Sequence, residues 1–232
     1  MITVATYFWS DPARAHRGYS FIPDHVRILR NMVARHLTLP HRFVCVTDDP
    51  VEGIDCVPLD WGKHVPGTVF IRLMQHNPEW ALARLGERIL SLDLDVVITG
   101  NFDHVASRTE DFLIWRNPNY PHRRSSFYQS SVQLFSAGAR PQLWSEFDPS
   151  ETPKWVNRRF TGAEQAWISE CLGFEEATFG AHDGIYGAGG LEPKEGPTVL
   201  PQNACIVSFP GKRDPSQAHV QAIHPWIVEH YR

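Results

Sequence analysis

Short apolar segments alternate with amphipathic segments along most of the chain, and this order limits the possible folds more than any other feature. Residues 22–37 carry Ile22, Val26, Leu29 and Val33 at helical spacing. Further helices are expected over residues 68–86, interrupted near Asn77-Pro78, and over residues 162–173, ended by Gly173. The segments expected to be strands are residues 2–8, 42–48, 56–59, 88–92, 111–115, 131–138 and 204–209. Strands that alternate with helices favour an α/β fold with a mainly parallel sheet and helices on both faces.

The chain length fits one large domain or two small ones. The sequence contains no internal repeat, low-complexity segment or interdomain linker. We therefore predict a single domain over residues 1–232. The stretch rich in glycine and proline at 180–202 is expected to be a long loop near a site.

Composition and charge exclude some classes of function. A net charge of -4 gives no reason to expect a nucleic-acid partner. No stretch approaches the roughly 18 apolar residues of a transmembrane helix, and the first residues have no basic region typical of a signal peptide. The four cysteines show no CxxC spacing, so we expect reduced, mostly buried thiols and a cytoplasmic protein.

Two aspartates follow the expected strand at 88–92, in the segment LDLDVVITGNFD. In open α/β sheets, ligands bind at the carboxyl ends of the strands, where Asp93 and Asp95 would lie. Carboxylates two residues apart on an extended segment project from the same side. Their oxygens suit Mg²⁺ or Mn²⁺ shared with phosphate oxygens. The alternative is a pair of carboxylates that cap the next helix or face solvent.

Four segments resemble the GT-A nucleotide-sugar glycosyltransferases, and among them the retaining family 8. The first is LDLDVVITGNFD, which is similar to the metal motif of that family. The others are FYQSSVQLFSAG, GAEQAWIS and IVSFPGKRDP. The last departs from the family pattern, because Ser208 stands where a histidine is usual and Asp214 where a lysine is usual. Glu164 stands where aspartate is more common.

The resemblance implies a GT-A (Rossmann-like) fold and a site for a nucleotide-sugar donor. Asp93 and Asp95 would bind Mn²⁺ or Mg²⁺, and Asp93 would also lie near the donor ribose. The residues implied at the donor are Thr6, Tyr7, Asp48, Arg72, Asp93, Gly211, Lys212 and Arg213.

Four of these donor residues have a physical argument of their own. Arg72 would grip phosphate or sugar with its planar fork, unless it is an ordinary surface arginine of a helix. Gly211 would let the backbone approach the diphosphate. Lys212 or Arg213 would supply the positive charge that Asp214 cannot, unless both belong to a solvated basic turn.

Residues at the sugar are also implied by the resemblance. Glu164 and Gln165 would line the sugar pocket, with Gln165 near the reacting face, although a first helical turn favours glutamate in any case. Ser131 would border the sugar or acceptor pocket. Apart from the resemblance, His182 lies in the glycine-rich segment GAHDGIYGAGG, which we expect to border the acceptor site. A divalent cation and a basic side chain would stabilise the leaving diphosphate. A retaining transfer would need no protein base if the leaving phosphate takes the proton of the acceptor.

The sequence therefore predicts a metal-dependent transferase that moves a sugar from a nucleoside diphosphate, with UDP expected, to an acceptor with retention. The acceptor would be a glycan, a lipid-linked molecule or a small molecule. Two alternatives stay open. One is a glycosyltransferase-like protein that binds a nucleotide or glycan without turnover. The other is a haloacid-dehalogenase-type phosphatase, because the segment ILSLDLDVVIT also resembles the first motif of that class.

Overall fold

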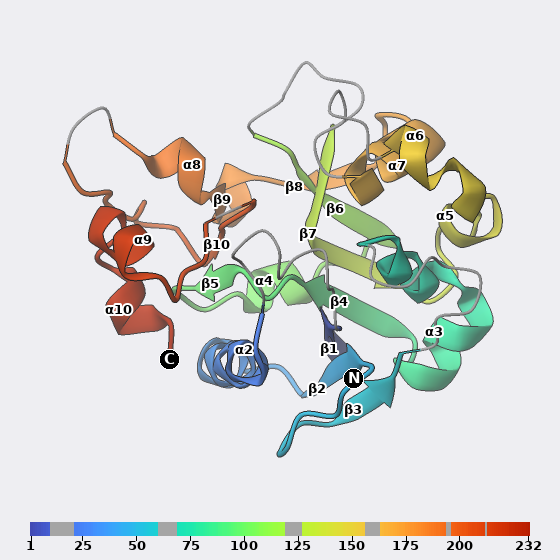
Figure 1. Ribbon diagram of the computed structural model, residues 1–232, viewed down its shortest axis with the longest axis horizontal. Helices are drawn as coiled ribbons and strands as arrows, with labels where there is room; N and C mark the ends of the chain where they lie inside the picture. The colour runs from blue at the N-terminus through green and yellow to red at the C-terminus, as the bar shows by residue number, and fades with distance from the viewer. Residues whose placement is uncertain (10–20, 60–68, 119–126, 156–162, 194–195, 212) are drawn as a thin grey trace.

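The computed structural model describes residues 1–9, 21–59, 69–118, 127–155, 163–193, 196–211 and 213–232 (Figure 1). In these ranges the chain forms a seven-stranded sheet and a smaller three-stranded sheet. In spatial order, the strands of the larger sheet are β3 (Cys56–Pro58), β2 (His41–Thr47), β1 (Ile2–Phe8), β4 (Arg88–Leu92), β7 (Tyr128–Ser136), β6 (Phe112–Arg116) and β8 (Ala177–Phe179).

The larger sheet is mainly parallel. Strands β3, β2, β1 and β4 pair in parallel, and β6 pairs in parallel with β8. Strand β7 runs antiparallel to both of its neighbours, β4 and β6. The carboxyl ends of β1, β2 and β4 therefore lie at one edge of the sheet. The α/β fold class that the alternation predicts is confirmed.

Alternating side chains give the larger sheet two apolar faces, and each face is covered. One apolar cluster joins Val4, Leu90 and Leu134 to helix α2 (Pro23–His36). The other joins Ala5, Ile89 and Phe135 to the 3₁₀ helix η1 (Val69–His76) and to four α-helices. These helices are α3 (Pro78–Arg84), α5 (Gln142–Ser145), α6 (Thr152–Trp155) and α7 (Ala163–Leu172). In Figure 1, α2 lies on one side of the sheet and α3, α5, α6 and α7 lie on the other.

Local sequence explains the helix boundaries. Helix α2 has Pro23 in its first turn, where a missing backbone N–H costs nothing, and the backbone N of Ile22 donates to His25 Nδ1 at 3.0 Å. The break expected near Asn77-Pro78 is confirmed, because Asn77 Oδ1 accepts from the backbone N of Trp80 at 3.1 Å and so caps α3. The half before the break is a 3₁₀ helix rather than an α-helix.

The smaller sheet begins just after the two aspartates. Its strands are β5 (Val96–Ile98), β10 (Ile206–Ser208) and β9 (Ile185–Gly187), with β10 in the centre. Strand β5 packs against α2 and α10 (Ile227–His230), so the smaller sheet covers the same face of the larger sheet as α2. Helix α9 (Ala218–Ile223) precedes α10, and both lie beside the smaller sheet in Figure 1.

Two local expectations differ from the structure. Residues 94–95 form a turn rather than extended chain, and this turn passes the chain from β4 to β5. The stretch 180–202 is not a continuous loop. It contains a 3₁₀ turn η4 (Ala181–Asp183), strand β9 and helix α8 (Ala188–Leu191), because β9 finds a parallel partner in β10, which comes later in the chain.

Strand β7 contains a bulge next to the carboxyl end of β4. Its pairing with β6 changes register between Ile114 and Trp115, which face Gln133 and Gln129 respectively. Residues 130–132 therefore have no partner on β6. A bulge redirects side chains and frees backbone groups from the ladder, and this one lies beside the two aspartates.

Candidate functional site

A cleft opens at the carboxyl ends of β1 and β4, where an α/β sheet is expected to bind its ligand. Its lining residues are Tyr7, Trp9, Phe21, Arg72, Asp93, Leu94 and Asp95. Three aromatic side chains and two carboxylates thus share one depression with a buried arginine. Both aspartates of the motif lie on this cleft even though the chain turns between them.

Arg72 lies at the centre of the polar groups. Its Nη1 is 2.6 Å from Asp93 Oδ1 and 3.5 Å from Glu164 Oε2, and its Nη2 donates to the backbone O of Ser130 at 2.9 Å. The guanidinium carbon lies 5.9 Å from the centre of the Tyr7 ring. Burial alone would lower the pKa of Arg72, but the charges of Asp93 and Glu164 outweigh it and raise this pKa. Arg72 is therefore a buried, permanently charged group and not a surface arginine of a helix.

The bulge in β7 supplies hydroxyl groups to the same carboxylates. Ser131 Oγ donates to Asp93 Oδ2 at 2.9 Å, and Ser130 Oγ donates to Glu164 Oε2 at 3.2 Å. Consecutive side chains of a regular strand point to opposite faces, so Ser130 and Ser131 reach one cluster because the strand is bulged there. The backbone N of Asp93 also donates to the O of Ser131 at 3.0 Å.

Tyr7 offers a hydroxyl group that the fold leaves for another molecule. The side chain is 6% exposed, and within the described residues its OH finds no hydrogen-bond partner. Burial raises the pKa of Tyr7, so the phenol stays protonated and keeps a proton to donate. A buried donor without a partner costs on the order of 1–3 kcal/mol, which a bound ligand would recover.

The oxygen atoms at the motif fit a hard divalent cation. Asp93 accepts from Arg72 and Ser131, but a carboxylate has about four acceptor positions and retains capacity for a metal. The described part of the chain contains no group of three or more His, Cys, Asp or Glu side chains suited to a metal. Two carboxylates with water and phosphate oxygens are the usual shell of Mg²⁺, so the donor set fits a cation that binds together with a diphosphate.

Ser208 lies deep beside the motif. It is fully buried, and its Oγ donates to Ser131 Oγ at 3.1 Å, so a chain of hydroxyl groups runs from Ser208 to Asp93. The pairing of β10 with β5 sets Ser208 opposite Val96, and the backbone N of Phe209 donates to the O of Asp95 at 2.8 Å. Asp214 Oδ2 lies 3.3 Å from His25 Nε2, and both side chains are buried.

Gln165 reaches the bulge from the first turn of α7. Its Nε2 donates to Gln129 Oε1, which also accepts from the backbone N of Ser131 at 3.2 Å. Glu164 lies in the same turn and is 3% exposed. Helix α7 therefore places Glu164 in the Arg72 cluster and links Gln165 through Gln129 to Ser131.

The other described residues named for the donor lie apart from this cluster. Thr6 is fully buried, and alternation along β1 directs it to the face opposite Tyr7. Asp48 is exposed just after β2. Gly211 has a φ of 86°, which suits glycine, but it is not among the residues that line the cleft. Arg213 Nε lies 2.9 Å from Glu192 Oε1, and Lys212 lies outside the described residues.

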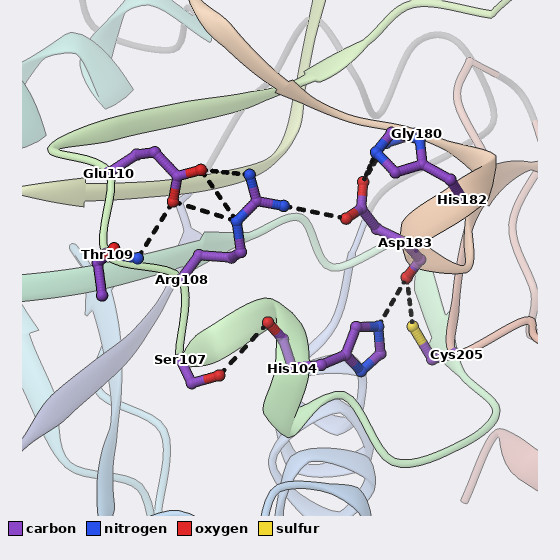
Figure 2. Close-up of polar contacts among 9 residues, drawn as sticks. All are labelled: His104, Ser107, Arg108, Thr109, Glu110, Gly180, His182, Asp183 and Cys205. Atoms are coloured by element: carbon purple, nitrogen blue, oxygen red, sulfur yellow. Dashed lines mark hydrogen bonds and ion pairs between the residues drawn. The ribbon is translucent and has the colours of Figure 1, made fainter.

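His182 belongs to a different cluster, shown in Figure 2. Its exposed ring lies 2.9 Å from Asp183 Oδ2, and Arg108 Nη1 lies 3.2 Å from Asp183 Oδ1. Arg108 also pairs with Glu110, and His104 Nε2 donates to the backbone O of Asp183 at 3.0 Å. None of these residues lines the cleft. In the structure, the contacts of Arg108 and His104 with Asp183 instead stabilise the turn η4.

Several residues at the site were not singled out from the sequence. These are Trp9, Phe21, Gln129 and Ser130. A signal existed for two of them, because three consecutive polar residues, Gln129 to Ser131, interrupt an otherwise apolar strand and indicate a bulge. Nothing in the sequence placed Trp9 or Phe21 beside Asp93.

Solved structures share this fold over nearly the whole chain. The galactosyltransferase LgtC, in complex with donor and acceptor sugar analogues, matches with a TM-score of 0.59 and 11% identity, over 97% of this chain and 94% of LgtC. An active-site glutamine-to-glutamate mutant of LgtC matches with a TM-score of 0.57 and 10% identity, over 98% and 96% of the two chains. The glycosyltransferase GlyE of Streptococcus pneumoniae TIGR4 matches with a TM-score of 0.58 and 11% identity, over 92% of this chain but only 57% of GlyE.

No protein-family model and no curated protein sequence matches the chain. At such low identity the structural likeness shows the fold, which is that of the GT-A glycosyltransferases, as the resemblance implied. No helix in the described residues is both long and apolar enough to cross a bilayer.

Proposed function

We propose that this protein, which has the glycosyltransferase fold, transfers a sugar from a nucleoside diphosphate donor to an acceptor with the help of a divalent cation. The observation that carries the proposal is the cluster of Arg72, Asp93 and Glu164 beside a cleft at the carboxyl ends of β1 and β4, in which Arg72 and Glu164 are buried and Asp93 is partly exposed. Such a cluster is costly to bury, so a role in binding charged ligands gives a reason for its position.

The cleft has the chemistry that a nucleotide sugar requires. Tyr7, Trp9 and Phe21 provide flat apolar surfaces for a base or a sugar ring, and Tyr7 adds a hydroxyl that can donate a hydrogen bond. Arg72 offers a planar fork suited to phosphate oxygens. A uridine donor is our specific proposal and rests on the family resemblance of the motif.

Asp93 and Asp95 are the residues that would hold Mn²⁺ or Mg²⁺. The cation would withdraw charge from the diphosphate as the bond to the sugar breaks. Ser131 fixes the orientation of Asp93 through its hydroxyl group. Arg72 provides a positive charge beside Asp93, which offsets the repulsion between the carboxylates of Asp93 and Asp95.

Glu164 and Gln165 would bind the sugar. Both lie in the first turn of α7, held by Ser130 and Gln129 respectively. In the LgtC mutant an active-site glutamine is replaced by glutamate, and we propose Gln165 as the residue that corresponds to this glutamine. We further propose that the configuration of the donor sugar is retained, which an NMR coupling constant of the product would measure.

The acceptor is proposed only as a class: a glycan, a lipid-linked molecule or a small molecule with a free hydroxyl group. The hydroxyl group of Ser131 donates its hydrogen bond to Asp93. The acceptor would therefore contact residues around Ser131 rather than accept a hydrogen bond from this hydroxyl group. His182 would reach the acceptor only if the acceptor extends as far as η4.

The test is a thermal-shift screen of nucleoside diphosphates and nucleotide sugars, each with Mn²⁺ and with EDTA. A ligand at 100 times its Kd adds about 2.7 kcal/mol to the free energy of unfolding, so a true donor stands out. We expect one base to be preferred, and only with metal. Turnover of the same donor would establish an enzyme, whereas binding without turnover would favour the non-catalytic alternative. No metal-dependent shift with any nucleotide would refute the proposal.

A further inference from the structure

The bulge in β7 frees one backbone carbonyl that a regular strand would use in its ladder. Because residues 130–132 have no partner on β6, the O of Ser130 takes no part in that pairing and accepts two side-chain donors. These are Arg72 Nη2 at 2.9 Å and Gln133 Nε2 at 3.1 Å. The orientation of Arg72 is therefore linked through one oxygen atom to Gln133.

Gln133 is an unusual residue for its position. It lies in the central part of the sheet and is fully buried. Its side chain points to the same face as that of Phe135, which is the face covered by η1. Burying an amide costs free energy unless it is hydrogen-bonded, so apolar packing does not explain glutamine here. Its Nε2 must face the O of Ser130, because a carbonyl can only accept.

His76 keeps this region free of a second positive charge. Its ring is 2% exposed and lies 5.0 Å from the ring of Phe135. Burial, and to a smaller degree the charge of Arg72, lowers the pKa of His76 to about 3. His76 is thus a neutral, fixed neighbour of Gln133, and the only cation among these groups is Arg72.

We propose that Gln133 is a positioning residue that fixes the guanidinium of Arg72 between Asp93 and Glu164. Gln133 donates a hydrogen bond to the O of Ser130, and this oxygen also accepts from Nη2 of Arg72. Nη1 of Arg72 is thereby directed toward Asp93 and Glu164. Gln133 itself does not line the cleft. Its effect on catalysis depends on the function proposed above, whereas its coupling to Arg72 does not.

The test compares Gln133→Met with Gln75→Met. Gln75 is a matched control, since it is equally buried and its amide lies beside His76 at 3.4 Å without contacting Ser130. Small displacements of a group that orients a substrate have large kinetic effects, so we expect Gln133→Met to lower kcat on the order of tenfold. KM for the donor should change less than twofold, and Gln75→Met should stay within twofold in both constants.

A double-mutant cycle separates positioning from general destabilisation. Arg72→Lys, Gln133→Met and the double variant are unfolded with urea, which requires no turnover. We expect the double variant to lose less stability than the two single variants together, because both act through the O of Ser130. In the Arg72→Lys background, Gln133→Met should cause no further loss of kcat.

Several results would overturn the proposal. Additive losses of stability would show that Gln133 and Arg72 are independent, and an equal effect of Gln75→Met would show a packing role. Gln133→Leu serves as a second variant without the amide. If neither Gln133 variant folds while Gln75→Met does, the residue is structural and the proposal fails. If the native protein turns over no donor, the proposed function is refuted. The urea double-mutant cycle would still decide whether Gln133 and Arg72 are coupled.

Discussion

Replacing Arg72 with Met should destabilise the fold far more than the loss of an ordinary salt bridge. The change removes a 7% exposed cation that contacts Asp93 and Glu164, and leaves both carboxylates where they are. Removing one partner of a buried ion pair costs about 3–5 kcal/mol. The Ser130 carbonyl also loses a charged donor, which places our estimate at the upper end of that range.

A matched control comes from Arg108, another arginine that bridges two carboxylates. Arg108 pairs with Glu110 and Asp183, as Figure 2 shows, but its side chain is 34% exposed. Exposed pairs contribute about 0–1 kcal/mol each, so Arg108→Met should lose roughly 1 kcal/mol. Urea unfolding of the three proteins, followed by circular dichroism, measures the difference directly.

The stability lost in Arg72→Met should depend on pH. The carboxylates of the cluster raise the pKa of Arg72, so in the native protein it stays charged at every usable pH and its contribution is constant. Without it, buried carboxylates close together resist ionisation. A carboxyl group that is harder to ionise in the folded state lowers the stability of the protein at high pH. This stability is regained as the pH falls and the group is protonated. The deficit should therefore shrink between pH 7 and pH 5.

Two results would refute this reasoning. A loss below about 1 kcal/mol, equal to that of Arg108→Met, would mean that the Arg72 cluster is open to water and contributes no more than a surface pair. A deficit that does not change between pH 7 and pH 5 would mean that the loss comes from packing. Added Mn²⁺ should also restore part of the stability of Arg72→Met, because a cation at Asp93 and Asp95 would replace the missing charge.

Three further predictions concern single side chains. Asp95→Ala should abolish metal-dependent nucleotide binding while leaving the fold intact, and Asp183→Asn, which is equally buried but away from the cleft, should bind normally in the same calorimetric titration. Ser208→His should tighten Mn²⁺ binding in the absence of donor and shift preference from Mg²⁺ to Mn²⁺, since imidazole suits the softer ion; unchanged metal affinity would count against a ligand position there. It should also cost about 1–3 kcal/mol, because the site is fully buried. His76→Leu should remove a loss of stability on acidification, since the pKa of His76 near 3 means that only the unfolded chain gains its proton as pH falls below about 6.5. Urea midpoints at pH 7 and pH 5 would measure it.

The sequence alone determined the kinds of elements and the place of the motif. Periods of two and of 3.6 residues are set by backbone geometry, so β1, α2, β2 and β4 could be predicted from the residues within each segment. The break at Asn77-Pro78 followed from capping chemistry in the same way. Because the carboxyl ends of parallel strands meet at one edge, Asp93 and Asp95 could also be assigned to a ligand site.

The tertiary structure alone decided what the aspartates meet. Residues 72, 93 and 164 come together because η1 and α7 both pack on the face of the sheet where β4 and β7 are neighbours. That antiparallel neighbour, the bulge in β7 and the pairing of β5 with β10 all depend on which distant segments adopt adjacent positions. A local pattern records the burial of a residue, but not the identity of the group across the interface. For that reason the sequence could propose a charged partner for Asp93, and only the packing of two helices and a bulged strand determined that Arg72 occupies this position.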